Sequence, residues 1–402
     1  MNALSRRDLL KASLLTAGSV GAGSLLSACG AGGDPASSSK PIRVGMLTDI
    51  TGAIGFYGKA ASNTAKLWIE RQNAAGGLLG RQLQLVLEDS ASDPSVGASK
   101  AKKMVQQNNV DVVVGGISSA MREAIKGQLI GRGGKLYFYP QLYEGGECEK
   151  YLYCTGPVPP QQVDPLIAYL AQQGGSRYYL PGADYVWPHQ VNKQVAKAVA
   201  ANGGTVTGEE YFPLDNTDYS KAVSDIMSNG TDVIFTTIVP PGAWNFFQQL
   251  SDRGYQKQGG KVVCVWVDET AFSAVQPQYI QGLISCLDYF KGVSDPFSEK
   301  LYKEYAAKFG SSGSLSASGT AGVWRALGLW GDAVARSKSL DRDEVAEALN
   351  TSKLDQALGG PTAMAPGENH CVMNLYVGEV QGKEMKVIET LSSVEPAQGC
   401  DL

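Results

Sequence analysis

The segment Val110-Asp111-Val112-Val113-Val114-Gly115-Gly116 is a short apolar run rich in β-branched residues, and Ser118 and Ser119 follow it. A run of this length and composition predicts a buried strand, and the serines are typical of a helix start. A strand that is apolar along its whole length belongs in a parallel sheet covered on both faces. The segment therefore predicts one unit of an α/β fold.

The same alternation of strand and helix extends along most of the chain. Strands are expected at residues 42–47, 83–87, 110–116, 135–139, 177–180, 206–212, 232–237 and 262–267. Helices are expected at residues 57–73, 93–108, from 119, 161–173, 191–202, 219–229 and 244–253. Alternation this regular predicts parallel sheets with helices on both faces. Because it occurs in two successive runs, we expect two doubly wound lobes.

The C-terminal part is expected to be shared between the lobes. It shows helical patterns at residues 296–309, 320–336 and 342–350 and short strands at 372–380 and 385–389. About 360 residues follow residue 39, more than one hydrophobic core usually holds. We expect an N-terminal lobe of residues 40–157 plus about 290–338 and a C-terminal lobe of 158–289 plus about 339–402. Several chain crossovers between them would form a hinge.

The N-terminus carries an export signal. The pattern Ser5-Arg6-Arg7-Asp8-Leu9-Leu10-Lys11 is a twin-arginine motif, and Leu26-Ser27-Ala28-Cys29 is a lipobox. The run between them is too short and too rich in Gly, Ser and Thr to span a bilayer comfortably. Residues 1–28 are therefore predicted to be a twin-arginine lipoprotein signal peptide, with Cys29 lipidated. The mature chain would be a membrane-anchored lipoprotein at the periplasmic or cell surface, with residues 29–39 as a flexible tether.

Charge limits the partners. The formal charge is −4, and removing residues 1–28 takes away three basic residues and one acidic residue, which leaves −6. This mild acidity argues against nucleic acid or anionic lipid as a partner of the folded body.

Six cysteines remain after Cys29, an even number in an oxidising compartment. Their grouping along the chain favours three local disulfides: Cys148–Cys154, Cys264–Cys286 and Cys371–Cys400. Six cysteines allow 15 connectivities, and buried free thiols are the alternative for any pair.

Candidate ligand contacts follow the strands, because ligands of open parallel sheets bind beyond the carboxyl ends of the strands. The hydroxyl and N–H groups of Ser118 and Ser119 are suited to hold a carbonyl or carboxylate oxygen, although helix capping is an alternative role. Gln141 and Tyr143 follow the next strand and offer donors and acceptors to the same cleft.

Aromatic residues at strand-to-helix loops of both lobes are further candidates. Tyr57, Tyr185 and Trp187 have flat faces that suit a planar amide or an apolar ligand, and burial in the core is their alternative role. The candidate cleft contains no Arg or Lys, which disfavours a phosphate or a dianion.

Enzyme motifs are missing from the sequence. The chain has two histidines, His189 and His370, and no two-His zinc helix, Cys-x-x-Cys pair, Gly-x-Ser-x-Gly elbow, phosphate loop or Gly-x-Gly-x-x-Gly motif. No catalytic residue, metal site or cofactor is expected.

Several motifs resemble a known family. TGAIGFYG at 51–58, NAAGGLLGR at 73–81 and EDSASDP at 88–94 resemble the opening of type I periplasmic substrate-binding proteins, the leucine/isoleucine/valine-binding class. YPQLYEG at 139–145, GPVPPQQ at 156–162, DYVWP at 184–188 and ENH at 368–370 are similar to the branch of urea-binding and short-chain-amide-binding proteins. The resemblance extends over roughly residues 40–389.

The resemblance implies a two-lobed protein that closes on a small polar ligand and delivers it to the permease of an inner-membrane ABC importer. A ligand like urea or a short-chain amide is expected; a branched-chain or aromatic amino acid, or a sensory role beside a regulator, is the alternative. In the amino-acid class the glutamate matching Glu269 meets the ligand ammonium, which makes Glu269 a candidate acceptor; a solvated loop carboxylate is its alternative. Ile117 and the pair Gln141-Leu142 depart from the branch, so the ligand itself stays open.

Overall fold

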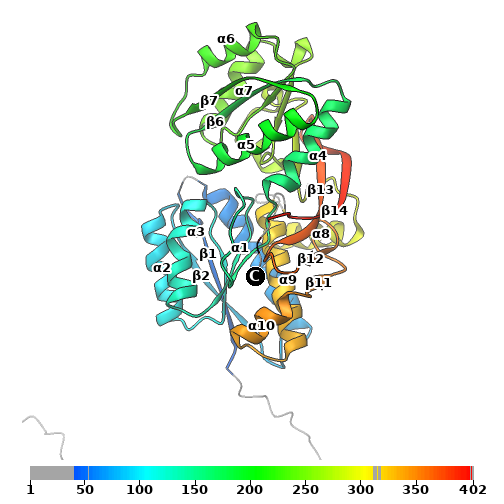
Figure 1. Cartoon of the computed structure of the whole chain (residues 1–402). Helices are drawn as coiled ribbons and strands as arrows, with labels where there is room; N and C mark the ends of the chain where they lie inside the picture. Colours follow the sequence, from blue (N-terminus) through cyan, green and yellow to red (C-terminus); the bar gives the residue numbers. More distant parts are fainter. Residues whose placement is uncertain (1–39, 53, 311–314, 316–317, 399, 401–402) are drawn as a thin grey trace, which may run out of the picture. The chain divides into compact units, whose positions relative to one another are not determined.

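Two β-sheets organise the chain in the computed structural model (Figure 1). The structure describes residues 40–52, 54–310, 315, 318–398 and 400, and both sheets belong to one compact unit, Ser39–Leu402. The expected signal peptide, lipidated Cys29 and tether lie outside the described residues.

The first sheet is parallel throughout. Its order is β2-β1-β3-β4-β5, and these strands are Leu83–Asp89, Ile42–Thr48, Val112–Gly115, Leu136–Tyr139 and Leu152–Cys154. β3 and β4 are buried along their whole length. This burial explains why their sequences are apolar without alternation.

The second sheet is mixed. Its order is β11-β12-β13-β10-β9-β8-β6-β7, and β14 pairs with β13. β6 to β10 are parallel neighbours, whereas β13 runs antiparallel to β10, β12 and β14. The strands are β6 Arg177–Ala183, β7 Thr205–Phe212, β8 Val233–Phe235, β9 Lys261–Cys264, β10 Ile284–Leu287, β11 Lys353–Leu354, β12 Thr362–Met364, β13 Cys371–Gln381 and β14 Glu384–Val394.

Ten α-helices lie in the part of the chain that the structure describes. They are α1 Gly55–Ala74, α2 Pro94–Gln106, α3 Ser119–Lys126, α4 Pro159–Gln172, α5 Val186–Ala201, α6 Ser220–Ser228, α7 Gly242–Asp252, α8 Pro296–Phe309, α9 Ser318–Ser337 and α10 Arg342–Leu349. α9 packs along α1, and α10 packs on α9, so helices late in the sequence cover the first sheet. The expected lobe boundaries stay a prediction.

The expected α/β fold with two sheets is confirmed. Four short strands were not expected from the sequence, namely β5, β10, β11 and β12. α5 starts five residues earlier than expected, at Val186, because Pro188 falls in its first turn, where proline is tolerated. Glycine allows α1 to approach the end of β1, since a Cβ at Gly58 would lie 1.9 Å from the carbonyl oxygen of Asp49.

Buried polar side chains hold the region where the chain passes between the sheets. Gln161 donates to the carbonyls of Cys371 and Val394, and Gln162 donates to those of Val265 and Cys286. These bonds satisfy backbone acceptors that would otherwise be buried without partners.

The expected disulfide pairing is wrong. The structure joins Cys148 to Cys400, with 5.5 Å between their Cα atoms, and Cys154, Cys264, Cys286 and Cys371 are buried free thiols. Cys264 is in register with Ser285 of the neighbouring strand, so Cys286 lies one residue further along and points to the opposite face. Burial raises the pKa of Cys264 to about 11 and that of Cys154 to about 12, which makes these thiols unreactive.

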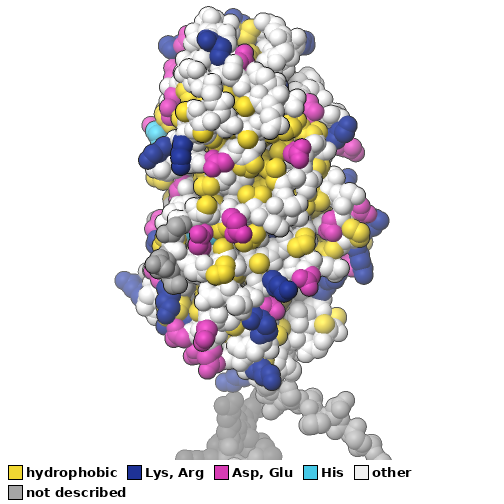
Figure 2. All heavy atoms as spheres, turned by 45° about the vertical axis from the view of Figure 1, so that its right-hand side comes forward, with side chains coloured by type: hydrophobic (Ala, Val, Ile, Leu, Met, Phe, Trp, Pro, Cys, Tyr) yellow, Lys and Arg dark blue, Asp and Glu magenta, His cyan; other side chains and the backbone are white. Residues whose placement is uncertain are grey.

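On the face shown in Figure 2, basic and acidic side chains are interspersed, so this face has no large patch of a single charge. Within the described residues, no helix combines the length and hydrophobicity needed to cross a bilayer.

Candidate ligand-binding site

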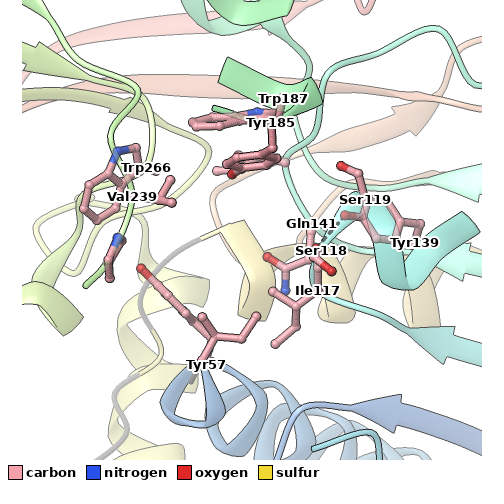
Figure 3. Close-up of a pocket in the computed structure, with 13 residues that line it drawn as sticks. Tyr57, Ile117, Ser118, Ser119, Tyr139, Gln141, Tyr185, Trp187, Val239 and Trp266 are labelled. Atoms are coloured by element: carbon pink, nitrogen blue, oxygen red, sulfur yellow. Dashed lines mark hydrogen bonds between the residues drawn. The ribbon is translucent and has the colours of Figure 1, made fainter. Parts of the chain in front are cut away.

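A cavity of about 170 Å³ opens between side chains that follow strands of both sheets (Figure 3). Most of its walls are aromatic or aliphatic, and the described lining includes no charged side chain. The lining residues are Ile54, Tyr57, Ile117, Ser118, Ser119, Tyr139, Gln141, Leu142, Tyr185, Trp187, Val239, Pro240 and Trp266.

The start of α3 supplies two polar groups. Ser118 is the N-cap, and its hydroxyl oxygen accepts a hydrogen bond of 3.1 Å from the N–H of Met121. Ser119 is the first helical residue, so its backbone N–H has no partner within the helix. The glycines before them are required, because a Cβ at Gly115 would lie 1.9 Å from the carbonyl oxygen of Leu47.

The segment after β4 supplies the neighbouring wall. The Tyr139 hydroxyl donates a hydrogen bond of 2.5 Å to the carbonyl oxygen of Ile117. Gln141 is 8% exposed, and among the described residues its carboxamide has no hydrogen-bond partner. A Cβ at Gly319 of α9 would lie 2.5 Å from Gln141 Nε2, so the Gln141 side chain packs closely against the backbone of α9.

The opposite wall comes from the second sheet. Tyr185 is the N-cap residue of α5 and Trp187 lies in its first turn, and the two rings stack with centroids 6.4 Å apart. Trp266 follows β9, and its indole N–H is buried without a hydrogen-bond partner. In Figure 3 these rings face Ile117, Ser118 and Gln141 across the cavity.

Tyr57 connects the two walls from the first turn of α1. Burial raises the pKa of its hydroxyl, the Asp268 charge raises it further, and a hydrogen bond with Thr270 opposes the rise. These neighbours follow β9 of the second sheet, so the Tyr57 side chain reaches from one lobe to the other.

Six of the eight ligand residues expected from the sequence therefore line one cavity, and Tyr143 and Glu269 do not. The Tyr143 hydroxyl lies 2.6 Å from His370 Nε2 and accepts a bond from the N–H of Glu147. Glu269 Oε1 accepts a hydrogen bond of 2.8 Å from the N–H of Lys291, and Oε2 is buried without a partner. Burial, followed by the Asp268 charge, raises the pKa of Glu269 to about 8.

Most of the apolar lining has no direct signal in the sequence. Ile54, Val239 and Trp266 look like ordinary core residues, and only their place beyond strand ends relates them to the cavity. Tyr139 was expected inside a strand, yet its hydroxyl reaches the cavity edge.

No cluster of three or more His, Cys, Asp or Glu side chains suited to a metal ion occurs among the described residues. An apolar cavity between two lobes, with a few polar groups at one side, is typical of a site that binds a small molecule.

Residues 41–384 match the sequence profile of the periplasmic binding protein family, and the chain belongs to this family. This membership agrees with the expectation that the protein is not an enzyme. It does not confirm the urea and amide branch.

Two curated relatives are similar over part of the chain. A Leu/Ile/Val-binding protein homolog of Brucella abortus is 25% identical over 54% of this chain, and the chain spans about half (56%) of that relative's length. An amino acid binding protein of Pseudomonas aeruginosa is 26% identical over 60% of this chain and 65% of its own length.

Solved structures share the fold. A solute-binding protein of an ABC transporter from Rhodopseudomonas palustris, in complex with 4-hydroxybenzoate, has a TM-score of 0.79 at 19% identity, covering 89% of this chain and 99% of that chain. A leucine-binding protein from Thermotoga maritima has a TM-score of 0.75 at 19% identity, covering 87% and 99%.

Proposed function

We propose that this protein is the extracytoplasmic solute-binding component of an ABC importer and captures a small ligand with one apolar ring or branched apolar body and a polar head. Family membership and the named roles of the relatives support the transport role. The observation that carries the ligand class is the cavity itself, which is ring-sized and walled mainly by aromatic side chains.

The cavity volume matches a single ring. A cavity of about 150 Å³ lined by apolar side chains is large enough to bind benzene. Here the volume is about 170 Å³, and Tyr185, Trp187 and Trp266 provide flat surfaces against which a ring packs. Urea and short-chain amides have no such body, so they would leave these walls in contact with water.

The polar head is expected at the start of α3. The hydroxyls of Ser118 and Ser119, the carboxamide of Gln141 and the free N–H groups of the first helical turn converge there. Because no Arg or Lys is among the described lining residues, a phosphate or a dianion is disfavoured. A neutral head or a single carboxylate fits this set.

Binding would favour the closed arrangement of the lobes. A ligand that contacts walls from both sheets gains contacts that an open arrangement lacks, and this differential affinity shifts the population toward closure. We propose that a permease recognises the closed form.

An amino acid with an apolar side chain is the second candidate. The names of the two curated relatives, a Leu/Ile/Val-binding protein homolog and an amino acid binding protein, support this candidate.

A thermal-shift screen tests the ligand class, since a ligand that binds only the native state raises the melting temperature. The panel contains benzamide, benzoate, 4-hydroxybenzoate, phenylalanine, leucine, urea, acetamide and a phosphorylated control. We expect ring compounds or apolar amino acids to shift the wild type and urea to shift it least.

Trp187→Ala is expected to abolish the shift, whereas Val186→Ala is a matched control, because Val186 is adjacent and 59% exposed. A shift with phosphorylated compounds alone would contradict the proposal.

A further inference from the structure

The Ser119 hydroxyl at the cavity wall is bound from behind by a carboxylate that the cavity does not expose. Ser119 Oγ lies 2.5 Å from Glu144 Oε2. The Glu144 side chain is 9% exposed and is absent from the cavity lining, whereas Ser119 belongs to it. The hydrogen-bonding state of Glu144 therefore decides what the Ser119 hydroxyl offers to a ligand.

Glu144 forms a buried ion pair with Arg122. The Arg122 Nη2 donates to Glu144 Oε1 at 2.8 Å, and the Arg122 side chain is only 6% exposed. Its guanidinium also lies over the rings of Tyr139 and Tyr143, at 5.1 Å and 4.7 Å from their centroids. The guanidinium therefore gives Glu144 a buried, charge-assisted hydrogen bond.

An ionised carboxylate only accepts hydrogen bonds, so Ser119 must be the donor in this pair. A hydroxyl has a single proton, and once that proton is engaged the oxygen has only lone pairs to offer. The Tyr139 hydroxyl is in the same state, because its proton is directed to the carbonyl oxygen of Ile117. Two of the hydroxyls at this wall thus face the cavity as acceptors.

We propose that Glu144 and Arg122 are positioning residues that fix the Ser119 hydroxyl as an acceptor, so that the site selects a head group carrying an N–H or O–H donor. This inference rests on the proposed function and narrows its ligand class. A primary amide fits best, since its N–H groups suit Ser119 Oγ while its carbonyl oxygen suits the free N–H groups at the start of α3. A carboxylate has no proton for Ser119.

The loop that carries Glu144 is held in place from the far end of the chain. Cys148 is bonded to Cys400, and the N–H of Gly146 donates to Gln398 Oε1 at 2.7 Å. Glu147, three residues after Glu144, lies 3.5 Å from Arg122 Nε through its Oε2. The carboxylate that accepts the Ser119 proton therefore belongs to a fixed network of contacts, and it is not an exposed side chain that rotates freely.

The test compares benzamide with benzoate, which have nearly the same shape but differ in the N–H donors. Dissociation constants are measured by calorimetry at one pH and one salt concentration for the wild type, Ser119→Ala, Glu144→Gln and the double variant. Glu123→Gln is the matched control. Glu123 also contacts Arg122, at 3.1 Å, and is 50% exposed, but it does not reach Ser119.

We expect the wild type to prefer benzamide. In Glu144→Gln the new carboxamide donates to Ser119 and frees the Ser119 proton for the ligand, so the preference should move toward benzoate by about three- to tenfold, the size of one hydrogen bond. Ser119→Ala should lose the preference to a similar extent, and Glu123→Gln should keep it.

The double variant separates positioning from a simple change of charge. The quantity compared is the ratio of the dissociation constants of benzoate and benzamide. If Glu144 acts through Ser119, then Glu144→Gln has no further effect on this ratio in the Ser119→Ala background. An effect that persists in that background overturns the proposal, and so does a Ser119→Ala variant that keeps the wild-type ratio. If neither a one-ring compound nor an apolar amino acid binds the wild type, the proposed function fails as well, whereas binding of benzamide and benzoate with unchanged ratios removes only the present inference.

Discussion

Asp268 is a fully buried carboxyl group four residues after the end of β9, and its burial disfavours the charged form. Its Oδ1 accepts hydrogen bonds from the N–H and the hydroxyl of Thr270, but Oδ2 has no partner. Burial raises the pKa to about 6, the Thr270 bonds oppose the rise, and the Asp288 charge adds to it. Because the folded state binds this proton more tightly than the unfolded state does, Asp268 costs stability as the pH rises from about 4 to about 6.

Asp268→Asn is therefore expected to raise the free energy of unfolding at pH 7.5, by on the order of 1–3 kcal/mol. The amide keeps an acceptor for Thr270 and has no charge to bury. Urea unfolding at intervals between pH 4 and pH 8 measures the effect, and the variant should lose less stability over this range than the wild type. Asp355→Asn is the control, since the Asp355 side chain is 90% exposed. An equal loss in the wild type and in Asp268→Asn would show that Asp268 is not the titrating group.

The position of a residue after a predicted strand showed which strand ends face the cavity. It was a poorer guide to the direction in which each side chain points. Ser118, Gln141 and Tyr185 were found because they directly follow buried strands. Tyr143 has the same kind of position, yet its ring turns inward to His370, and no local pattern records that partner 227 residues away. The Cys148–Cys400 bridge was missed for the same reason, since its residues are 252 positions apart.

At the scale of elements, Arg325 connects α9 to the segment after β10. Its guanidinium forms a buried ion pair with Asp288, and its Nε donates to the carbonyl oxygen of Thr155 at 2.9 Å. Both side chains are nearly inaccessible to water. Removing one member of such a pair leaves a charge buried without compensation.

Arg325→Met is expected to destabilise the protein by about 3–5 kcal/mol. The double variant Arg325→Met/Asp288→Leu should recover much of this loss, because no charge then remains buried. Denaturant unfolding at constant pH checks both expectations. Lys221→Met, at an ion pair on the exposed surface, should change stability little. A double variant as unstable as the single one would mean that lost packing, rather than the orphaned charge, dominates.

Long elements were predictable and short ones were not. β1, α2 and β7 have enough residues for a periodic pattern. Asp93 marks the start of α2, because its carboxylate accepts hydrogen bonds from the N–H groups of Ser95 and Val96. β5 and β12 have three residues each, too few for a periodic pattern, so they exist only through pairing with the adjacent strands. The antiparallel position of β13 likewise depends on its partners and leaves no local signal.

At the scale of the whole molecule, the family and the N-terminal motifs point to the same compartment. A protein with the proposed transport role works outside the cytoplasm, and a lipid anchor would keep it near the membrane that holds the proposed permease. The six cysteines that follow Cys29 include one bridge, Cys148–Cys400, which agrees with an oxidising environment. The anchor itself is a prediction from Arg6, Arg7 and Cys29.

Cys29→Ser is expected to release the protein from membranes, because the diacylglycerol thioether has no other attachment point in the predicted lipobox. Arg6→Lys combined with Arg7→Lys should instead leave precursor in the cytoplasm, since the export route reads the arginine pair. Membrane fractionation followed by immunoblotting distinguishes the two outcomes, and Ser27→Ala, within the lipobox but not the lipidated residue, is the control expected to stay membrane-bound. A Cys29→Ser protein that still sediments with membranes as the wild type does would reject the lipid anchor.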